Sequence, residues 1–314
     1  MIILTGATGN LGSRILHHLL TTLSLDPSQL IITTSNLDSP KITALKQSHP
    51  TLQIRHADFL NPSTLPPAFE SGTKLILISY PGIDDNRSLA HKNVITAAQQ
   101  SPTITQIYYT SLAFLSPTKS HVMLAHIGTE EILTALPTTS EKLKYTIIRE
   151  GIYNESFPLY IGFYSPGDTS VSLAVGDGAI SFASRDELGE ATARIVLSDS
   201  DKYTNKLLTL TGPESIPLSQ VVSTISEITG SHVSFNLISK EEYVEKFKNR
   251  GDFVSKWVLS HDAIADGECA DVTGTLEEVL GRKSVRFVDY LREELKDAGK
   301  AKEGLGVGVG TYSR

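Results

Sequence analysis

The chain has 314 residues, of which 40% are hydrophobic and 20% are charged, with a formal net charge of −7. This composition is typical of a globular protein with a sizeable core and excludes a disordered chain. Because no lysine or arginine cluster offsets the negative charge, we expect no nucleic-acid partner.

The compartment is predicted from one cysteine and from the apolar runs. Cys269 is the only cysteine, so no disulfide can form within the chain, which favours a reducing compartment. Met1 abuts the first apolar run, which leaves no room for a leader peptide, and no run has membrane-spanning length. We expect a cytoplasmic monomer or homodimer that contacts no membrane.

The first residues predict a strand, a glycine turn and a helix. Ile2 to Leu4 is an apolar run too short for a helix, and three glycines follow it, Gly6, Gly9 and Gly12. Apolar residues then recur at helical spacing from 11 to 23, with His17 and His18 on the polar, solvated side. Such a turn lets a helix N-terminus approach a pyrophosphate, although a tight turn without ligand uses the same glycines.

Strands and helices alternate in the rest of the first half. The expected strands and helices, in chain order, are 30–34, helix 41–48, 52–55, one or two helical turns in 63–70, 74–79, helix 87–100, 104–111, helix 120–136 and 144–149. This alternation implies right-handed βαβ crossovers. We therefore predict an α/β fold with a Rossmann-type doubly wound parallel sheet.

The character of the sequence changes near Gly151. Residues 151–182 are rich in Gly, Ser, Tyr and Pro and allow two or three short strands. The elements expected beyond them are a helix opened by Ser184, strand 207–211, a helix from 218 to Gly230, strand 233–237, a capping box at Ser239 and Glu242, and helices to about 300.

These elements suggest a division into domains. We expect an NAD(P)-binding domain at 1–150 that also takes back about 183–211. A smaller α+β substrate-binding region would comprise 151–182 and 212–300. The glycine-rich segment 301–314 would form a flexible tail.

Several blocks resemble the NmrA-like group of atypical short-chain dehydrogenase/reductases, over residues 1 to about 290. They are 5–12, 77–79, 91–95, 109–112, 126–130 and 145–153. Their order and spacing are similar to those of the group's quinone oxidoreductases, and the Ser/Thr-rich style resembles fungal members acting in secondary metabolism. The resemblance implies a nucleotide motif made of Gly6, Thr8, Gly9, Asn10, Leu11 and Gly12.

The end of the second strand bears on the choice of cofactor. It reads Thr33-Thr34-Ser35-Asn36, and no acid stands at the tip to bind ribose hydroxyls, which argues against strict NAD use. Relatives in the group carry an arginine where Ser35 stands. The hydroxyls of Thr34 and Ser35, the Asn36 amide and Lys41 could hold a 2′-phosphate instead, so we expect NADP rather than NAD.

Further cofactor contacts are expected at strand ends. Asp58 and Phe59 resemble the family's contacts to the adenine edge, although Asp58 equally suits a turn cap. Ligands in open α/β sheets bind at the carboxyl ends of strands. The residues there are Ser79, Tyr80, Thr110 and Ser111, each of which could also be an ordinary strand-end polar residue.

The usual catalytic pair of short-chain reductases is absent. That pair is Tyr-x-x-x-Lys on one helix face, and Val122 and His126 stand at the corresponding positions. Reducing a ketone forms an alkoxide that needs a positioned acid, whereas reducing a quinone forms a phenolate with a pKa near ~10. The substitution is therefore compatible with quinone-like acceptors, and also with no catalysis.

Candidate substrate-side groups lie near the sixth strand and the helix before it. We expect His126 and Tyr153 to be catalytic and Tyr80, His121 and Asn154 to bind substrate. A packed histidine at 126 and an amphipathic tyrosine at a domain seam are the alternatives. No His/Cys/Asp cluster has zinc-like spacing, so no metal is predicted.

Three functions remain open. The first is an NAD(P)H-dependent reductase of a quinone or related conjugated aromatic or polyketide-like small molecule. The second is an NAD(P)-sensing regulator without turnover. The third is a non-redox tailoring enzyme, an isomerase or cyclase on the same scaffold.

Overall fold

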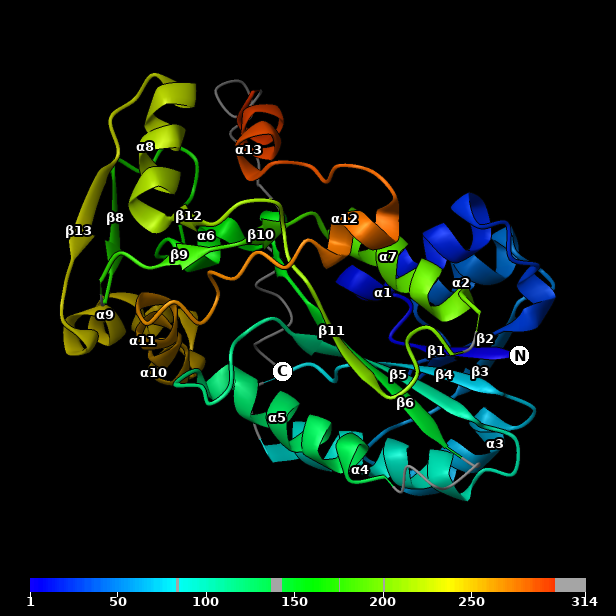
Figure 1. Cartoon of the computed structure of the whole chain (residues 1–314). Helices are drawn as coiled ribbons and strands as arrows, with labels where there is room; N and C mark the ends of the chain where they lie inside the picture. The colour runs from blue at the N-terminus through cyan, green and yellow to red at the C-terminus, as the bar shows by residue number, and fades with distance from the viewer. Residues whose placement is uncertain (83–84, 137–142, 175, 200, 297–314) are drawn as a thin grey trace. The chain divides into compact units, whose positions relative to one another are not determined.

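The computed structural model describes residues 1–82, 85–136, 143–174, 176–199 and 201–296 (Figure 1). The chain forms two compact units. Unit 1 comprises Met1–Leu112, Ala125–Glu150 and Asp186–Thr209, and unit 2 comprises Ala113–Leu124, Gly151–Arg185 and the chain from Leu210 onward. The predicted tail at 301–314 lies outside the described residues. That unit 1 holds the cofactor and unit 2 the substrate stays a prediction.

Unit 1 is built on a seven-stranded sheet with the order β11-β6-β5-β4-β1-β2-β3. Its strands are β1 (Ile2–Thr5), β2 (Leu30–Thr34), β3 (Gln53–His56), β4 (Lys74–Ile78), β5 (Gln106–Leu112), β6 (Lys144–Glu150) and β11 (Lys206–Leu210). Each neighbouring pair from β6 to β3 is parallel. The order reverses between β1 and β4, which is the switch point where ligands bind in such sheets. The predicted doubly wound fold is confirmed.

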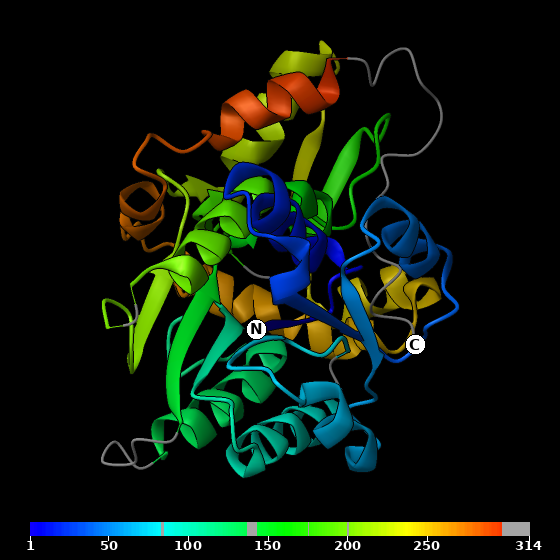
Figure 2. The ribbon, with the colours of Figure 1, turned by 90° about the vertical axis from the view of Figure 1, so that its right-hand side faces the viewer.

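The helices of unit 1 cover both faces of this sheet (Figures 1 and 2). They are α1 (Asn10–His17), continued by the π turn η1 (His18–Thr22), η2 (Pro27–Gln29), α2 (Pro40–Ser48), η3 (Pro62–Thr64), α3 (Leu65–Phe69), α4 (Asp85–Gln100), α5 (His121–Thr134) and α7 (Arg185–Leu197). Helices α3, α4 and α5 lie on one face, and α1 and α7 on the other. All four residues of β1 are consequently buried, as expected of a central parallel strand.

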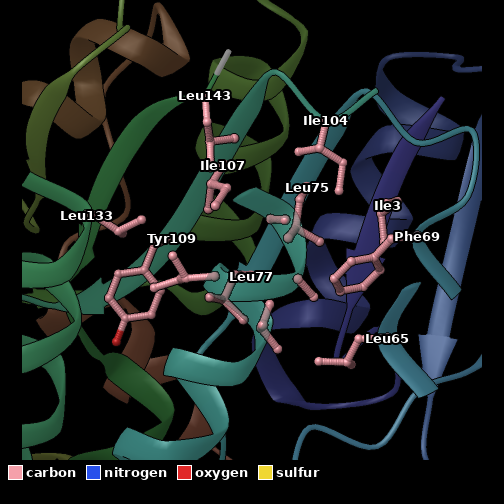
Figure 3. Close-up of a cluster of buried hydrophobic side chains, with 14 of the residues drawn as sticks. Ile3, Leu65, Phe69, Leu75, Leu77, Ile104, Ile107, Tyr109, Leu133 and Leu143 are labelled. Carbon is pink, nitrogen blue, oxygen red and sulfur yellow. The ribbon is translucent and has the colours of Figure 1, made fainter. Parts of the chain in front are cut away.

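A core cluster fills the space between the sheet and α3, α4 and α5 (Figure 3). Ile3, Leu75 and Leu77 from the sheet meet Phe69 of α3 and Leu133 of α5, each at most 1% exposed. Burying one such side chain contributes about 1.5–3 kcal/mol. This packing holds the carboxyl ends of β1, β4 and β5 in fixed positions.

The solvated position predicted for His18 is wrong. Its side chain is 6% exposed. Its Nδ1 lies 2.8 Å from the Thr22 hydroxyl, and its Nε2 lies 3.3 Å from the Asp186 carboxylate on α7. A segment 168 residues away in the sequence covers this side of the helix, and helical periodicity carries no information about it.

Unit 2 contains short strand pairs and several helices. They are β7 (Ile152–Tyr153), η4 (Asn154–Ser156), α6 (Phe157–Tyr160), β8 (Ser170–Leu173), β9 (Ala179–Ile180), β10 (Phe182–Ala183), β12 (Ile216–Pro217), α8 (Leu218–Thr229), β13 (Ser234–Leu237), α9 (Lys240–Phe247), η5 (Lys248–Arg250), α10 (Phe253–Trp257), α11 (Leu259–Ala265), α12 (Thr275–Leu280) and α13 (Phe287–Leu295). The predicted stop at Gly230, with φ of +67°, and the capping box of Ser239 and Glu242 are confirmed.

In the part of the chain that the structure describes, no helix is both long enough and apolar enough to cross a membrane.

A buried carboxyl at the end of β6 predicts a pH effect on stability. Glu150 is 1% exposed, and its Oε1 accepts a 2.7 Å hydrogen bond from the Thr192 hydroxyl. Burial raises the pKa of Glu150 to about 8. Since the folded chain holds this proton more tightly than the unfolded chain, the free energy of unfolding falls as pH rises from about 4.5 to about 8. Glu150→Gln keeps an acceptor for Thr192 and removes this loss.

We expect Glu150→Gln to be more stable than the wild type at alkaline pH, by about 1–3 kcal/mol, and to match it near pH 4.5. Urea unfolding at both pH values measures the difference. Glu131→Gln, at an exposed position on α5, is the control and should change stability little at either pH. An equal effect of Glu150→Gln at both pH values would contradict the prediction.

Candidate functional site

A glycine turn joins β1 to α1 at the switch point of the sheet. Gly6 has φ of +60°, a left-handed conformation that favours glycine. Its carbonyl oxygen accepts a hydrogen bond from the Gly9 amide at 2.9 Å. A Cβ at Gly12 would lie 2.1 Å from that oxygen and 2.9 Å from Cδ1 of Ile78 on β4. Gly6 is therefore needed for the turn, and Gly12 for the close approach of helix and strand.

The N-terminus of α1 presents backbone donors. Its N-cap is Gly9, no side chain of the described residues caps it, and its first turn contains no acid. The Ser13 amide closes the first helical hydrogen bond, to the Gly9 carbonyl at 3.0 Å. By helix geometry the N–H groups of Asn10, Leu11 and Gly12 are not used inside the helix. These donors and the helix dipole favour an anion at this end.

A cation stands beside the turn. The exposed side chain of Lys41, in the first turn of α2, donates a hydrogen bond to the Thr8 carbonyl at 3.1 Å. The predicted nucleotide residue Thr8 and the predicted phosphate ligand Lys41 are therefore brought together. The arrangement places a positive charge within reach of a phosphate bound near the turn.

Some of the predicted phosphate ligands in the loop after β2 form hydrogen bonds within the loop itself. The Thr34 hydroxyl accepts from the Asn36 amide at 3.2 Å, and the Asn36 side-chain oxygen accepts from the Asp38 amide at 3.0 Å. The Ser35 side chain is exposed. Ser35 and the side-chain amide nitrogen of Asn36 therefore remain candidates for phosphate contact.

The segment after β3 shows one of the two roles considered for Asp58, the turn cap, and its contact to adenine stays a prediction. Its carboxylate accepts a hydrogen bond from the Leu60 amide at 2.9 Å, which is the turn-capping contact. The Phe59 carbonyl accepts from the Asn93 side chain at 2.8 Å, and the Phe59 ring centroid lies 6.0 Å from that of Tyr80. Phe59 and Tyr80, from different strand ends, thus lie together.

Polar groups at the ends of β4 and β5 form a connected set. The Ser79 amide donates to the Thr110 hydroxyl at 3.2 Å, and the Tyr80 amide donates to Nε2 of His91 at 2.8 Å. Burial lowers the pKa of His91 to about 3, so the ring is neutral. Because Nε2 accepts, Nδ1 carries the proton and donates to Thr129, 2.7 Å away. His91 is a positioning residue for the turn that carries Ser79 and Tyr80.

His126 is enclosed inside unit 1. It is 3% exposed, its Nδ1 lies 2.8 Å from the Tyr109 hydroxyl, and its Nε2 contacts the Arg87 guanidinium. Arg87 also donates to the Ser79 hydroxyl at 2.7 and 3.1 Å. Burial first, and then the charge of Arg87, hold the pKa of His126 well below its usual value. Both ring nitrogens are engaged, so the geometry favours the packed-histidine alternative over an acid that reaches substrate.

Ser111 is held by a buried ion pair. Its hydroxyl donates to Glu130 at 2.6 Å, and Arg149 donates to the same carboxylate at 2.9 and 2.6 Å. Glu130 and Arg149, like His91 and Tyr109, lie in the sequence blocks that resemble the family. The sequence does not predict that Glu130 and Arg149 pair, because no spacing rule links them. Arg87 lies outside those blocks, and no sequence signal marks it.

The remaining predicted residues belong to unit 2, which includes the first four residues of α5, His121 to Leu124, and are described within it. The Arg185 guanidinium lies 5.9 Å from the ring centroid of Tyr153, and His121 is partly buried at the start of α5. Asn154 is 0% exposed, and neither atom of its amide finds a hydrogen-bond partner among the described residues. An unsatisfied buried amide costs free energy, which a ligand that bonds to it would relieve.

The described residues hold no group of three or more His, Cys, Asp or Glu side chains placed to bind a metal ion. Cys269 is buried.

Taken together, the glycine turn, the uncapped helix and the parallel switch point define the dinucleotide-binding class of α/β proteins.

No protein-family model matches the chain. The chain is 32% identical over 309 residues to an NmrA-like family domain-containing oxidoreductase of Aspergillus flavus, a match that covers 93% of this chain and 94% of that protein. It is 27% identical over 292 residues to quinone oxidoreductase 2 of Escherichia coli, covering 92% and 96%.

Two solved structures share the fold. An E. coli NADPH-dependent quinone oxidoreductase complexed with NADPH has a TM-score of 0.82 at 24% identity, covering 94% of this chain and 100% of that one. A Citrobacter triphenylmethane reductase complexed with NADP(H) has a TM-score of 0.80 at 24% identity, covering 93% and 99%. The chain belongs to the NmrA-like family of oxidoreductases.

The placement of His126 predicts a large effect on stability. His126→Ala removes the contacts to Tyr109 and Arg87 and opens a cavity, so we expect a loss of about 2–4 kcal/mol in the free energy of unfolding. His121→Ala, on the same helix at a partly exposed position, should cost less than about 1 kcal/mol. Urea unfolding of both variants measures this, and equal losses would show that His126 is not a packing residue.

Proposed function

We propose that the chain is an NADPH-dependent reductase that delivers a hydride to a quinone or a related conjugated aromatic carbonyl compound. The observation that carries this proposal is the cradle formed by Gly6, Gly12 and the uncapped N-terminus of α1. A Cβ at position 12 would fill the space where helix meets strand. The residues present therefore fit a dinucleotide pyrophosphate.

NADP is favoured over NAD by the charges around the adenosine end. Lys41 supplies a cation 3.1 Å from the Thr8 carbonyl, and the exposed Ser35 supplies a hydroxyl. The strand β2 ends without the acid that would bond ribose hydroxyls and repel a 2′-phosphate. Two relatives with the same fold were solved with NADPH or NADP(H), which supports the same preference here.

The acceptor class follows from the acid–base groups near the strand ends. A bound reduced nicotinamide supplies the hydride. Val122 is apolar, and the buried, neutral His126 is engaged with Tyr109 and Arg87, so neither position supplies a proton to substrate. A quinone needs no such donor, because its phenolate product takes a proton from water. The contribution of the protein is then to orient the acceptor and to exclude water.

The relatives support this acceptor class. One curated relative, 27% identical, is named a quinone oxidoreductase, and one structural neighbour is named a triphenylmethane reductase. Each name refers to a compound with unsaturated six-membered rings. A quinone-like acceptor is therefore the substrate class that residues and relatives favour jointly.

A substrate panel tests this function. With purified protein and NADPH, we expect acceptor-dependent loss of nicotinamide absorbance with benzoquinones and naphthoquinones. A simple aliphatic ketone should react about 100-fold or more slowly in kcat/KM, because its alkoxide needs an acid. Tight NADPH binding without oxidation by any acceptor would instead support a regulator that senses the cofactor. NADPH-independent turnover would support a tailoring enzyme.

Two glycine variants serve as controls in that assay. Gly12→Ala places a methyl group 2.1 Å from the Gly6 carbonyl oxygen and should abolish NADPH binding. A Cβ at Gly128 on α5 meets nothing within 4 Å, so Gly128→Ala should retain binding.

The cofactor preference has its own test. Lys41→Gln should weaken NADPH binding about 10- to 100-fold, the usual contribution of one charge-assisted hydrogen bond, and change NADH binding little. Lys46→Gln, an exposed lysine on the same helix, is the matched control. Equal weakening of NADPH and NADH by Lys41→Gln would place the lysine away from the 2′-phosphate.

A further inference from the structure

Unit 2 contains a cluster of three polar aromatic side chains from three successive helices, Tyr243 of α9, Trp257 of α10 and His261 of α11. The ring centroids of Tyr243 and His261 lie 4.6 Å apart, and those of Trp257 and His261 lie 6.4 Å apart, both edge to face. We call these three residues the donor cluster.

Each member of the donor cluster has a buried polar atom without a hydrogen-bond partner among the described residues. The side chains are 0%, 3% and 3% exposed. The Tyr243 hydroxyl, the Trp257 indole nitrogen and Nε2 of His261 complete no hydrogen bond with any described residue. Burial raises the pKa of Tyr243, and the nearby Trp257 indole counters part of that rise. The indole nitrogen and the phenol oxygen do not, however, have the geometry of a hydrogen bond. Leaving one such group unsatisfied costs about 1–3 kcal/mol.

All three atoms are hydrogen-bond donors. The Ala174 amide donates to Nδ1 of His261 at 3.0 Å, so Nδ1 is the acceptor nitrogen. Burial lowers the pKa of His261 to about 4, so the ring is neutral and its proton sits on Nε2. The indole nitrogen only donates, and the phenol can donate. Each of the three donors therefore lacks an acceptor among the described residues, and an oxygen atom is an acceptor that suits each of them.

A strained residue completes the surroundings. Phe163 has φ of +58°, a left-handed conformation that is costly for a bulky side chain and that is retained mainly at functional sites. The Phe163 ring lies 6.3 Å from that of Tyr243 and 5.0 Å from that of Phe247, measured between centroids. Arg250 lies 5.0 Å from the Phe163 ring and adds positive charge. The donors thus sit among aromatic faces, as a planar aromatic ligand would require.

We propose that the donor cluster binds a carbonyl oxygen of a planar aromatic compound, and so forms an acceptor subsite within unit 2. The proposal rests on the proposed function, since it identifies where one oxygen of the acceptor is held. Because the three side chains are at most 3% exposed, binding there requires the packing around the cluster to open. A single trapped water molecule would also accept from these donors, and the experiment separates the two.

Trp257 makes the test direct, because it is the only tryptophan in the chain. The full-length wild type, without cofactor, is titrated with 2-methyl-1,4-naphthoquinone and with 2-methylnaphthalene, which has the same rings and no oxygen. Corrected for light absorption, Trp257 emission should change saturably with the quinone and not with the hydrocarbon. Tyr243→Phe should weaken the quinone response about 10-fold, as loss of one donor predicts. Tyr164→Phe, at another buried tyrosine of unit 2, should not.

The outcomes separate this inference from the proposed function. No saturable response in the wild type, or an equal response to the hydrocarbon, overturns the subsite and leaves a trapped water as the acceptor; this arm needs no variant to fold. A wild-type response in a folded Tyr243→Phe variant overturns it as well. Oxidation of NADPH by the quinone without a Trp257 response overturns the subsite alone. A Trp257 response without oxidation overturns the reductase alone.

Discussion

The close approach of α1 to β1 at Gly12 is the constraint on which unit 1 depends. At this point a helix backbone, a turn carbonyl and a β4 side chain occupy space that any Cβ would fill. The approach directs the N–H groups of α1 at the switch point, and no side chain of the described residues caps them. An anion at that position satisfies backbone groups that the fold itself leaves unpaired.

The buried polar groups beside this cradle have a different role. Arg87, His91 and His126 connect α4 and α5 to the ends of β4 and β5. Burial keeps both histidines neutral, so the network is made of hydrogen bonds rather than ion pairs around these rings. It fixes Ser79 and Tyr80 in place without offering a proton. This is the arrangement expected where the protein positions reactants and the cofactor carries the chemistry.

Local patterns were sufficient for much of unit 1. Apolar runs such as Leu75 to Ile78 predict strands because both faces of a parallel sheet are covered. The glycines predict the turn because position 6 has a left-handed backbone conformation and position 12 has no room for a side chain. The same patterns could not decide between a cofactor contact and a turn cap for Asp58, whose carboxylate caps a turn. Nor could they decide between a catalytic and a packed role for His126, because its neighbours Arg87 and Tyr109 lie 39 and 17 residues away in the chain.

The sequence by itself determined the alternation of strands and helices, the glycine turn and the lack of an acid immediately after β2, because each is a property of neighbouring residues. Only the tertiary structure decided that His18 is covered by Asp186 and that both nitrogens of His126 are engaged. It also decided that Tyr243, Trp257 and His261 lie together, each with a donor that no described residue satisfies. Burial and hydrogen-bond partners come from segments distant in the chain, and local periodicity does not contain them.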